Sequence, residues 1–138
     1  MKILAIDFGM KRMGFAVGNT DPRTAAPIAP LVRQNEQQDT MYIQNLLDEY
    51  DIAKIIIGYP LNMDGSKSDV TLQVENFARQ IKERFAIESE FVDERLTSFE
   101  AEEMLKEFQP DYKKRKKVLD SVSALVILRS YLESVGAL

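Results

Sequence analysis

Three acidic positions in this sequence combine the residue type and the placement of a metal-dependent catalytic site. Asp7 ends an apolar run, the pair Asp93-Glu94 ends the last predicted strand, and Asp120 opens the last helical segment. Carboxylates that converge at the end of a buried sheet repel one another unless cations bind between them. Carboxylate oxygens suit Mg²⁺ or Mn²⁺, and two such ions about 4 Å apart stabilise the attacking and the leaving oxygen of a phosphodiester. If the fold brings these positions together, the sequence therefore predicts a divalent-metal site.

Each of these carboxylates also has an ordinary structural explanation. Asp7 could cap the turn that follows it through its own backbone. Asp93 and Glu94 could end a strand in solvent, with Arg95 as a surface ion partner worth under about 1 kcal/mol. Asp120 could be the N-cap or a first-turn acid of its helix. For any one position the ordinary explanation is favoured, whereas the three together favour a metal site.

Composition narrows the chemistry that such a site can use. The chain has 138 residues, of which 45% are apolar and 29% are charged, as in a soluble globular domain. It contains no cysteine and no histidine, which excludes disulfides, thiolate nucleophiles, a Ser-His pairing and most zinc sites. No apolar run approaches the roughly 20 residues of a membrane helix, and no secretory signal pattern begins the chain. Catalysis must therefore use carboxylates, lysine, hydroxyls or a metal bound by oxygen.

The cations are clustered in a chain whose formal net charge of −4 argues against general affinity for nucleic acid. Lys11 and Arg12 follow Asp7 in a turn, and Lys67 lies in a loop rich in Gly, Asn and Ser. Five consecutive cations precede Asp120, namely Lys113, Lys114, Arg115, Lys116 and Lys117. All of them could contact a nucleic-acid backbone, although exposed surface charge is the commoner explanation for each taken alone. The Lys67 loop lacks the glycine and lysine spacing of a P-loop.

The elements that must position these residues are short apolar runs and amphipathic segments. Strands are predicted at 3–8, 12–18, 26–33, 53–58 and 88–93, and helices at 39–50, 69–85, 99–108 and about 118–134. Two prolines confine the strand at 26–33 to a sheet edge. Asp39 and Ser98 are the expected N-caps of two helices, and the basic run is expected to form a loop. No repeat or domain boundary is found, so residues 1–138 are expected to form one domain.

This order of elements predicts an α/β fold with a mixed five-stranded sheet. The first three strands suggest an antiparallel meander, and the last two, each entered from a helix, suggest parallel right-handed crossovers with helices on both faces. In such sheets, ligands bind at the carboxyl ends of the central parallel strands. If strands one, four and five are neighbours, Asp7 and the pair Asp93-Glu94 share that edge.

Four blocks of residues resemble the YqgF (RuvX-like) family, in the family's order and over nearly the whole chain. The blocks are Ile6-Asp7-Phe8-Gly9 with Lys11-Arg12 and Gly14, then Gly58-Tyr59-Pro60-Leu61-Asn62-Met63-Asp64-Gly65, then Asp93-Glu94-Arg95-Leu96-Thr97-Ser98, and finally Asp120 with Ala124 and Ile127-Leu128. Many members have a histidine shortly before the last aspartate and paired alanines after it. Here Val118 and Leu119 precede it and Ser123-Ala124 replaces the pair, so any role of that histidine is absent.

The resemblance implies a ribonuclease H-like fold, a cytoplasmic location and a divalent-metal nuclease site made of Asp7, Glu94 and Asp120. Neighbouring strand residues point to opposite faces, so at most one of Asp93 and Glu94 should reach the site directly, and the resemblance selects Glu94. The family is described both as a Holliday junction resolvase, by similarity to RuvC, and as the nuclease that matures the 5′ end of the small-subunit (16S) ribosomal RNA precursor.

The leading hypothesis is therefore an endonuclease that uses two Mg²⁺ or Mn²⁺ ions to mature the 16S rRNA precursor. Phosphates would be bound by Lys11, Arg12, Lys67, Arg95 and the run Lys113, Lys114, Arg115, Lys116 and Lys117. Resolution of branched DNA is the first alternative. A second is a module that binds RNA or ribosomal particles without cutting, which the acidic net charge and the missing histidine favour. We expect no membrane association and a monomer or a weak homodimer.

One further enzyme class shares a short motif with this chain. Actin-like ATPases and sugar kinases open with a strand-turn-strand phosphate motif that resembles Asp7-x-Gly9 followed by Gly14. Those enzymes need two such domains to enclose the nucleotide, and 138 residues cannot supply both. This class is therefore disfavoured.

Overall fold

The structure, a computed structural model, describes residues 1–95, 103 and 112–135, and for residues 112–121 it describes the backbone alone. Its centre is a five-stranded sheet with the strand order β3-β2-β1-β4-β5. The strands are β1 (Lys2–Phe8), β2 (Arg12–Thr20), β3 (Arg23–Val32), β4 (Lys54–Tyr59) and β5 (Glu88–Asp93). β1 pairs antiparallel with β2 and β2 with β3, whereas β1 pairs parallel with β4 and β4 with β5. The predicted mixed sheet is confirmed, with strands one, four and five as neighbours.

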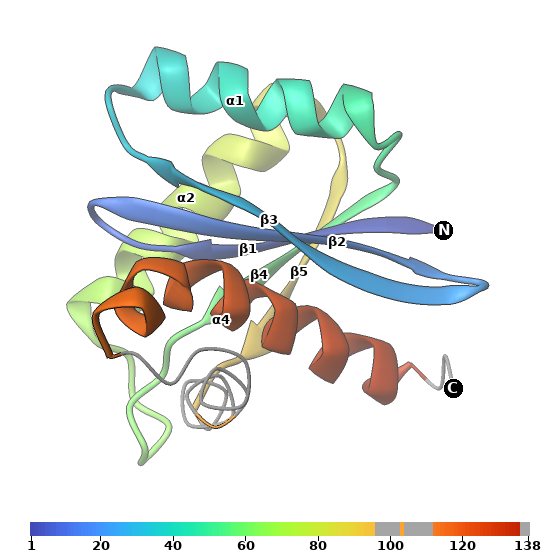
Figure 1. The fold of residues 1–138 in the computed structure, drawn as a ribbon. Helices are drawn as coiled ribbons and strands as arrows, with labels where there is room; N and C mark the ends of the chain where they lie inside the picture. The colour runs from blue at the N-terminus through green and yellow to red at the C-terminus, as the bar shows by residue number, and fades with distance from the viewer. Residues whose placement is uncertain (96–102, 104–111, 136–138) are drawn as a thin grey trace.

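The helices cover both faces of this sheet. Helices α1 (Glu36–Glu49) and α2 (Asp69–Phe85) pack on one face, and α4 (Tyr112–Ser134) packs on the other (Figure 1). No helix in the described part of the chain has the length and apolarity needed to cross a membrane.

The proline-containing strand β3 lies at a sheet edge, as predicted. Its pairing with β2 is irregular, because Met13 faces Leu31 while Phe15 faces Ile28. Two residues of β3 therefore stand opposite one residue of β2, which is a β-bulge. Pro30 is one of these two residues of the bulge, so its missing N–H does not interrupt a regular ladder.

Strict alternation along the strands divides the core into two layers. Leu4 and Ile6 are fully buried on the side of α1 and α2, whereas Ile3 and Ala5 are fully buried on the side of α4. β4 is buried on both faces, with Ile56 packed toward α4. Because side chains two apart share a face, the α4 face of β1 continues from Ala5 to Asp7.

The start of α1 differs from the prediction. Asn35, not Asp39, is the N-cap, and its side-chain oxygen accepts a hydrogen bond from the Gln38 N–H at 2.9 Å. Asp39 lies in the first turn of the helix, is only 5% exposed and forms an ion pair with Arg33. The prediction of Asp39 as the N-cap was wrong because Asn and Asp are equally good caps, and Asn35 comes first in the chain.

The expected loop at the basic run was wrong, since residues 113–117 lie within α4. Lys and Arg have high helix propensity, and Pro110 precedes the first helical residue, Tyr112. Asp120 consequently lies about two turns inside the helix, so it is not an N-cap. The predicted helix at 99–108 lies, except for Glu103, outside the described residues, and so does its proposed cap Ser98.

Candidate active site

The carboxyl groups of Asp7 and Glu94 meet at the carboxyl ends of the parallel strands. Asp7 is the penultimate residue of β1, and Glu94 directly follows β5. The Glu94 N–H donates to the Tyr59 carbonyl at 3.1 Å, which continues the ladder between β4 and β5 by one residue. Both acidic side chains are half-buried, and they share a hydrogen bond. Two of the three predicted carboxylates are thus brought together by the fold.

The electrostatics of this pair favour a bound cation. Burial raises the pKa of the Glu94 carboxyl above its usual value, the hydrogen bond with Asp7 opposes that rise, and the negative charge of Asp93 adds to it. Two carboxyl groups in contact need a proton or a cation between them, because two adjacent negative charges repel strongly in a partly buried site. The pair is therefore a suitable ligand set for a hard cation.

Gly58 makes this contact possible. β4 lies between β1 and β5, and Gly58 follows Ile56 by two positions, so it faces α4 as Asp7 does. A Cβ atom at Gly58 would lie 2.5 Å from the Glu94 Cδ and 2.7 Å from the Ile127 Cδ1. The missing side chain lets the Glu94 carboxyl extend across β4 toward Asp7. Sequence reasoning missed this role, although a glycine that ends the run Ile55-Ile56-Ile57 was an available signal.

Asp93 is directed to a different partner from Glu94. The Arg95 Nε and Nη2 atoms lie 2.8 Å and 2.7 Å from the Asp93 Oδ2, and the Arg95 N–H donates to Oδ1 at 3.0 Å. The hydrogen bond from the Arg95 side chain lowers the pKa of Asp93, and burial opposes that effect only in part. Arg95, which was predicted to bind phosphate, is therefore held in a local ion pair.

Lys67 is also held within the protein. Its Nζ lies 2.8 Å from the Glu75 Oε2, and the Tyr59 hydroxyl donates to the same oxygen at 2.7 Å. The hydrogen bond from Lys67 lowers the pKa of Glu75 and raises that of Lys67 itself. This arrangement ties the loop after β4 to α2. Lys67 therefore anchors a loop in this structure, and its predicted contact with phosphate stays a prediction.

Lys11 and Arg12 form the exposed turn between β1 and β2. Arg12 begins β2 and precedes Gly14 by two positions, and Gly14 is the register partner of Asp7. Strand alternation therefore places Arg12 on the face of the sheet that carries Asp7. No ion pair joins either cation to another residue among those that the structure describes.

The remaining predicted site residues lie on α4. Asp120 and the run Lys113, Lys114, Arg115, Lys116 and Lys117 belong to its backbone-only part. Among the described side chains, no group of three acidic, histidine or cysteine residues is close enough to hold a metal ion. The described part of the site is thus the Asp7–Glu94 pair.

A family model and curated proteins match nearly the whole of this chain. A family model described as "RuvX: Holliday junction resolvase" matches residues 1–134. A protein of Syntrophomonas wolfei is 38% identical over 133 residues, covering 96% of this chain and 94% of its own. A protein of Escherichia coli O157:H7 strain EC4115 is 42% identical over 132 residues, covering 95% of both chains. Both carry the curated name "Putative pre-16S rRNA nuclease".

Solved structures agree on the fold. Thermus thermophilus RuvC superposes with a TM-score of 0.60 at 10% identity, covering 99% of this chain and 98% of its own. The fowlpox virus resolvase, solved with Holliday junction DNA, superposes with a TM-score of 0.64 at 16% identity, covering 98% and 99%. These likenesses confirm the predicted ribonuclease H-like architecture.

Proposed function

The chain belongs to the RuvX family, and from this premise we propose that it is a metal-dependent endonuclease with Asp7, Glu94 and Asp120 as its catalytic carboxylates. The observation that carries the proposal is the contact between Asp7 and Glu94 at the carboxyl ends of neighbouring parallel strands. Such edges are where α/β sheets bind ligands. The proposal treats residues 1–138 as one nuclease domain.

Helix periodicity supports Asp120 as the third member. Ala124 and Ile127 follow it by four and seven positions, a spacing that places all three positions on one face of α4. Ala124 is fully buried against the sheet, and the Ile127 Cδ1 lies beside Gly58, over which Glu94 extends. This spacing supports the proposal that Asp120 occupies the face of α4 that packs against the sheet.

The donor set fits divalent cations that prefer oxygen. Carboxylates are its only charged oxygen donors, and the chain has no histidine or cysteine to attract zinc. We assign Mg²⁺ or Mn²⁺ to Asp7, Glu94 and Asp120, with two ions bound. When bound, these ions supply activation of the attacking water and neutralisation of charge at the scissile phosphate. The protein's own part is to hold the carboxylates together and to orient the phosphate through Lys11 and Arg12.

We propose that the enzyme cleaves the 16S rRNA precursor at its 5′ end, and that it acts on ribosomal particles in the cytoplasm. The support comes from curated relatives of that name, which match nearly the full length of this chain at about 40% identity. Branched DNA is the second candidate, because the family description and the fold neighbours are resolvases.

A direct comparison of the two substrates tests this proposal. Purified protein is incubated with a labelled 16S precursor fragment and with a DNA four-way junction, in Mg²⁺, in Mn²⁺ and in EDTA. Metal-dependent cleavage of the RNA at its mature 5′ end is the expected result. Cleavage of the junction alone would favour the resolvase, and tight binding without cleavage of either substrate would favour a non-cleaving module.

We expect Lys11→Gln/Arg12→Gln to weaken nucleic-acid binding and to reduce its salt dependence. Each lost phosphate contact makes the slope of log K against log salt shallower by about 0.7–0.9. Fluorescence anisotropy with the labelled precursor in Ca²⁺, between low and moderate salt, measures this slope. Arg79→Gln/Lys82→Gln is the matched control, because both cations are exposed on α2, across the sheet from Asp7. Equal effects of the two double variants would contradict the proposal that Lys11 and Arg12 bind substrate phosphates.

A further inference from the structure

One residue holds three consecutive carbonyl groups of the turn between β1 and β2. The Arg33 Nη1 donates to the carbonyl oxygens of Gly9 at 3.1 Å and Met10 at 3.5 Å. The backbone N–H of Arg33 donates to the Lys11 carbonyl at 2.9 Å. Exposed turn carbonyls are normally satisfied by water, so three bonds from a single residue fix the path of this turn.

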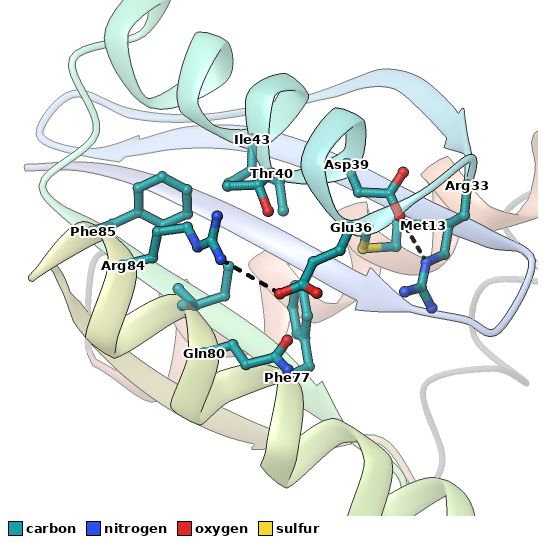
Figure 2. Close-up of a pocket in the computed structure, with 11 residues that line it drawn as sticks. Met13, Arg33, Glu36, Asp39, Thr40, Ile43, Phe77, Gln80, Arg84 and Phe85 are labelled. Atoms are coloured by element: carbon teal, nitrogen blue, oxygen red, sulfur yellow. Dashed lines mark hydrogen bonds and ion pairs between the residues drawn. The ribbon is translucent and has the colours of Figure 1, made fainter.

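The Arg33 guanidinium is itself fixed from two other directions. Its Nε donates to the Asp39 Oδ2 at 3.2 Å, and the other Asp39 oxygen accepts from the Gln34 N–H at 3.1 Å. Its Cζ lies 4.9 Å from the centre of the Phe8 ring, within cation–π distance. Figure 2 shows Arg33 and Asp39 facing each other at one end of the groove between α1 and α2. The planar donor fork of arginine suits this several-sided contact, which a lysine cannot reproduce.

The turn that Arg33 holds carries the cations assigned to the substrate. It is tight at its start, since a Cβ atom on Gly9 would lie 2.4 Å from the Arg12 carbonyl oxygen. Asp7 lies upstream of the turn, in the ladder between β1 and β2 opposite Gly14. Displacing the turn would therefore move Lys11 and Arg12 and leave the carboxylate pair in place.

We infer that Arg33 is a positioning residue, which binds the carbonyls of Gly9, Met10 and Lys11 so that Lys11 and Arg12 face the nucleic acid. This inference rests on the proposed function, since it assigns these two cations to substrate phosphates. Arg33 itself lies on the α1 and α2 side of the sheet and acts through the turn.

A second ion pair in the same groove provides a matched control. Arg84 of α2 binds Glu36 of α1 at 3.4 Å (Figure 2), and neither residue hydrogen-bonds to the turn in the part of the chain that the structure describes. Both pairs join elements on one face of the sheet, and both contain one arginine and one acid of α1. The Arg33–Asp39 pair is the more buried of the two, so the stability of both variants has to be compared, whereas a loss of substrate binding by the folded protein would be specific to Arg33.

The test compares Arg33→Met/Asp39→Leu with Arg84→Met/Glu36→Leu. Both partners are replaced because a single change would leave buried Asp39 without its cation and could unfold the protein. Binding of the labelled 16S precursor fragment is measured by anisotropy in Ca²⁺, and thermal unfolding is measured alongside. We expect the Arg33 variant to fold and to bind about tenfold more weakly at low salt. The slope of its log K against log salt should become shallower by about one to two. The loss should appear mainly in KM, with a smaller effect on kcat, because Asp7 is held upstream of the turn.

Other outcomes would overturn the role of Arg33, the phosphate contacts of Lys11 and Arg12, or the nuclease proposal separately. A folded Arg33 variant with wild-type affinity and salt slope would show that Arg33 does not position the turn. An equal loss in the Arg84 variant would reduce Arg33 to a stabilising residue. If Lys11→Gln/Arg12→Gln binds normally, Lys11 and Arg12 do not bind substrate phosphates, and the inference about Arg33 fails with that assignment. If wild type binds but never cleaves, the nuclease proposal fails, while the binding comparison still decides the role of Arg33.

Discussion

Asp7→Asn is expected to lower the metal-dependent cleavage rate by about a thousandfold, with little change in fold. The asparagine is nearly the same size, and it removes one of two negative charges that the fold holds in contact. A thousandfold loss corresponds to about 4 kcal/mol of transition-state stabilisation, which is within the several kcal/mol that a bound metal supplies. Single-turnover cleavage of the 16S precursor fragment in Mg²⁺ measures the effect.

A readout without substrate separates metal binding from catalysis. A ligand that binds only the folded state raises the Tm, so Mn²⁺ should stabilise wild type and should not stabilise Asp7→Asn. Asp93→Asn is the control, because Asp93 directly precedes Glu94 in the chain but forms its ion pair with Arg95. It should cut at nearly the wild-type rate and keep its Mn²⁺-dependent rise in Tm. Full activity of Asp7→Asn would eliminate the proposed site.

Gly58→Ala is expected to reduce cleavage by about a hundredfold while costing only modest stability. The added methyl group would overlap the Glu94 carboxyl and the end of Ile127, which are flexible side-chain ends that can move aside. Moving them costs at most about 1–3 kcal/mol, as for other overpacked cores. Displacing a catalytic group by about 1 Å, however, costs about a hundredfold in rate. Cleavage assays and thermal unfolding on the same preparation measure both quantities.

Gly18→Ala is the control variant, because it should lower stability and leave the cleavage rate unchanged. A Cβ at Gly18 would lie 2.4 Å from the Thr24 carbonyl oxygen, which belongs to the backbone of β3 and cannot move without distorting the sheet. Gly18 pairs with Ile3, at the end of β1 away from Asp7. This variant should unfold at a lower temperature yet cleave normally when it is folded. A Gly58→Ala enzyme with a normal rate would exclude steric control of Glu94 by this position.

Most strands could be predicted because they contain short apolar runs between turn residues, whereas β5 has only Phe91 and Val92 as apolar residues. The choice of Glu94 over Asp93 rested on the family resemblance together with the alternation of a strand, and the structure brings Glu94 to Asp7 and Asp93 to Arg95. Gly58 is conspicuous at the end of an apolar run, but its role could not be assigned from the sequence, because that role depends on the register that places it between two carboxyl groups.

The cations were harder to interpret than the carboxylates. Lys67 and Arg95 have the residue type that binds phosphate, but their partners Glu75 and Asp93 become apparent only in three dimensions. The link from Arg33 to Asp39 was hidden for a similar reason, since Asp39 has the sequence signature of a helix cap. Charged side chains form their contacts through tertiary structure, which local patterns do not encode.

The strand order has a consequence for the newly synthesised chain. β1 is made first and can pair at once with β2, but its other edge must wait for β4, which follows α1. Glu94 comes later still, after β4 and α2. Such non-local pairing is slow, because loop closure precedes the contacts that reward it. A chain emerging from the ribosome therefore presents an open hairpin edge but no paired carboxylates, so the proposed nuclease stays inactive until Glu94 has been synthesised and β5 has joined the sheet.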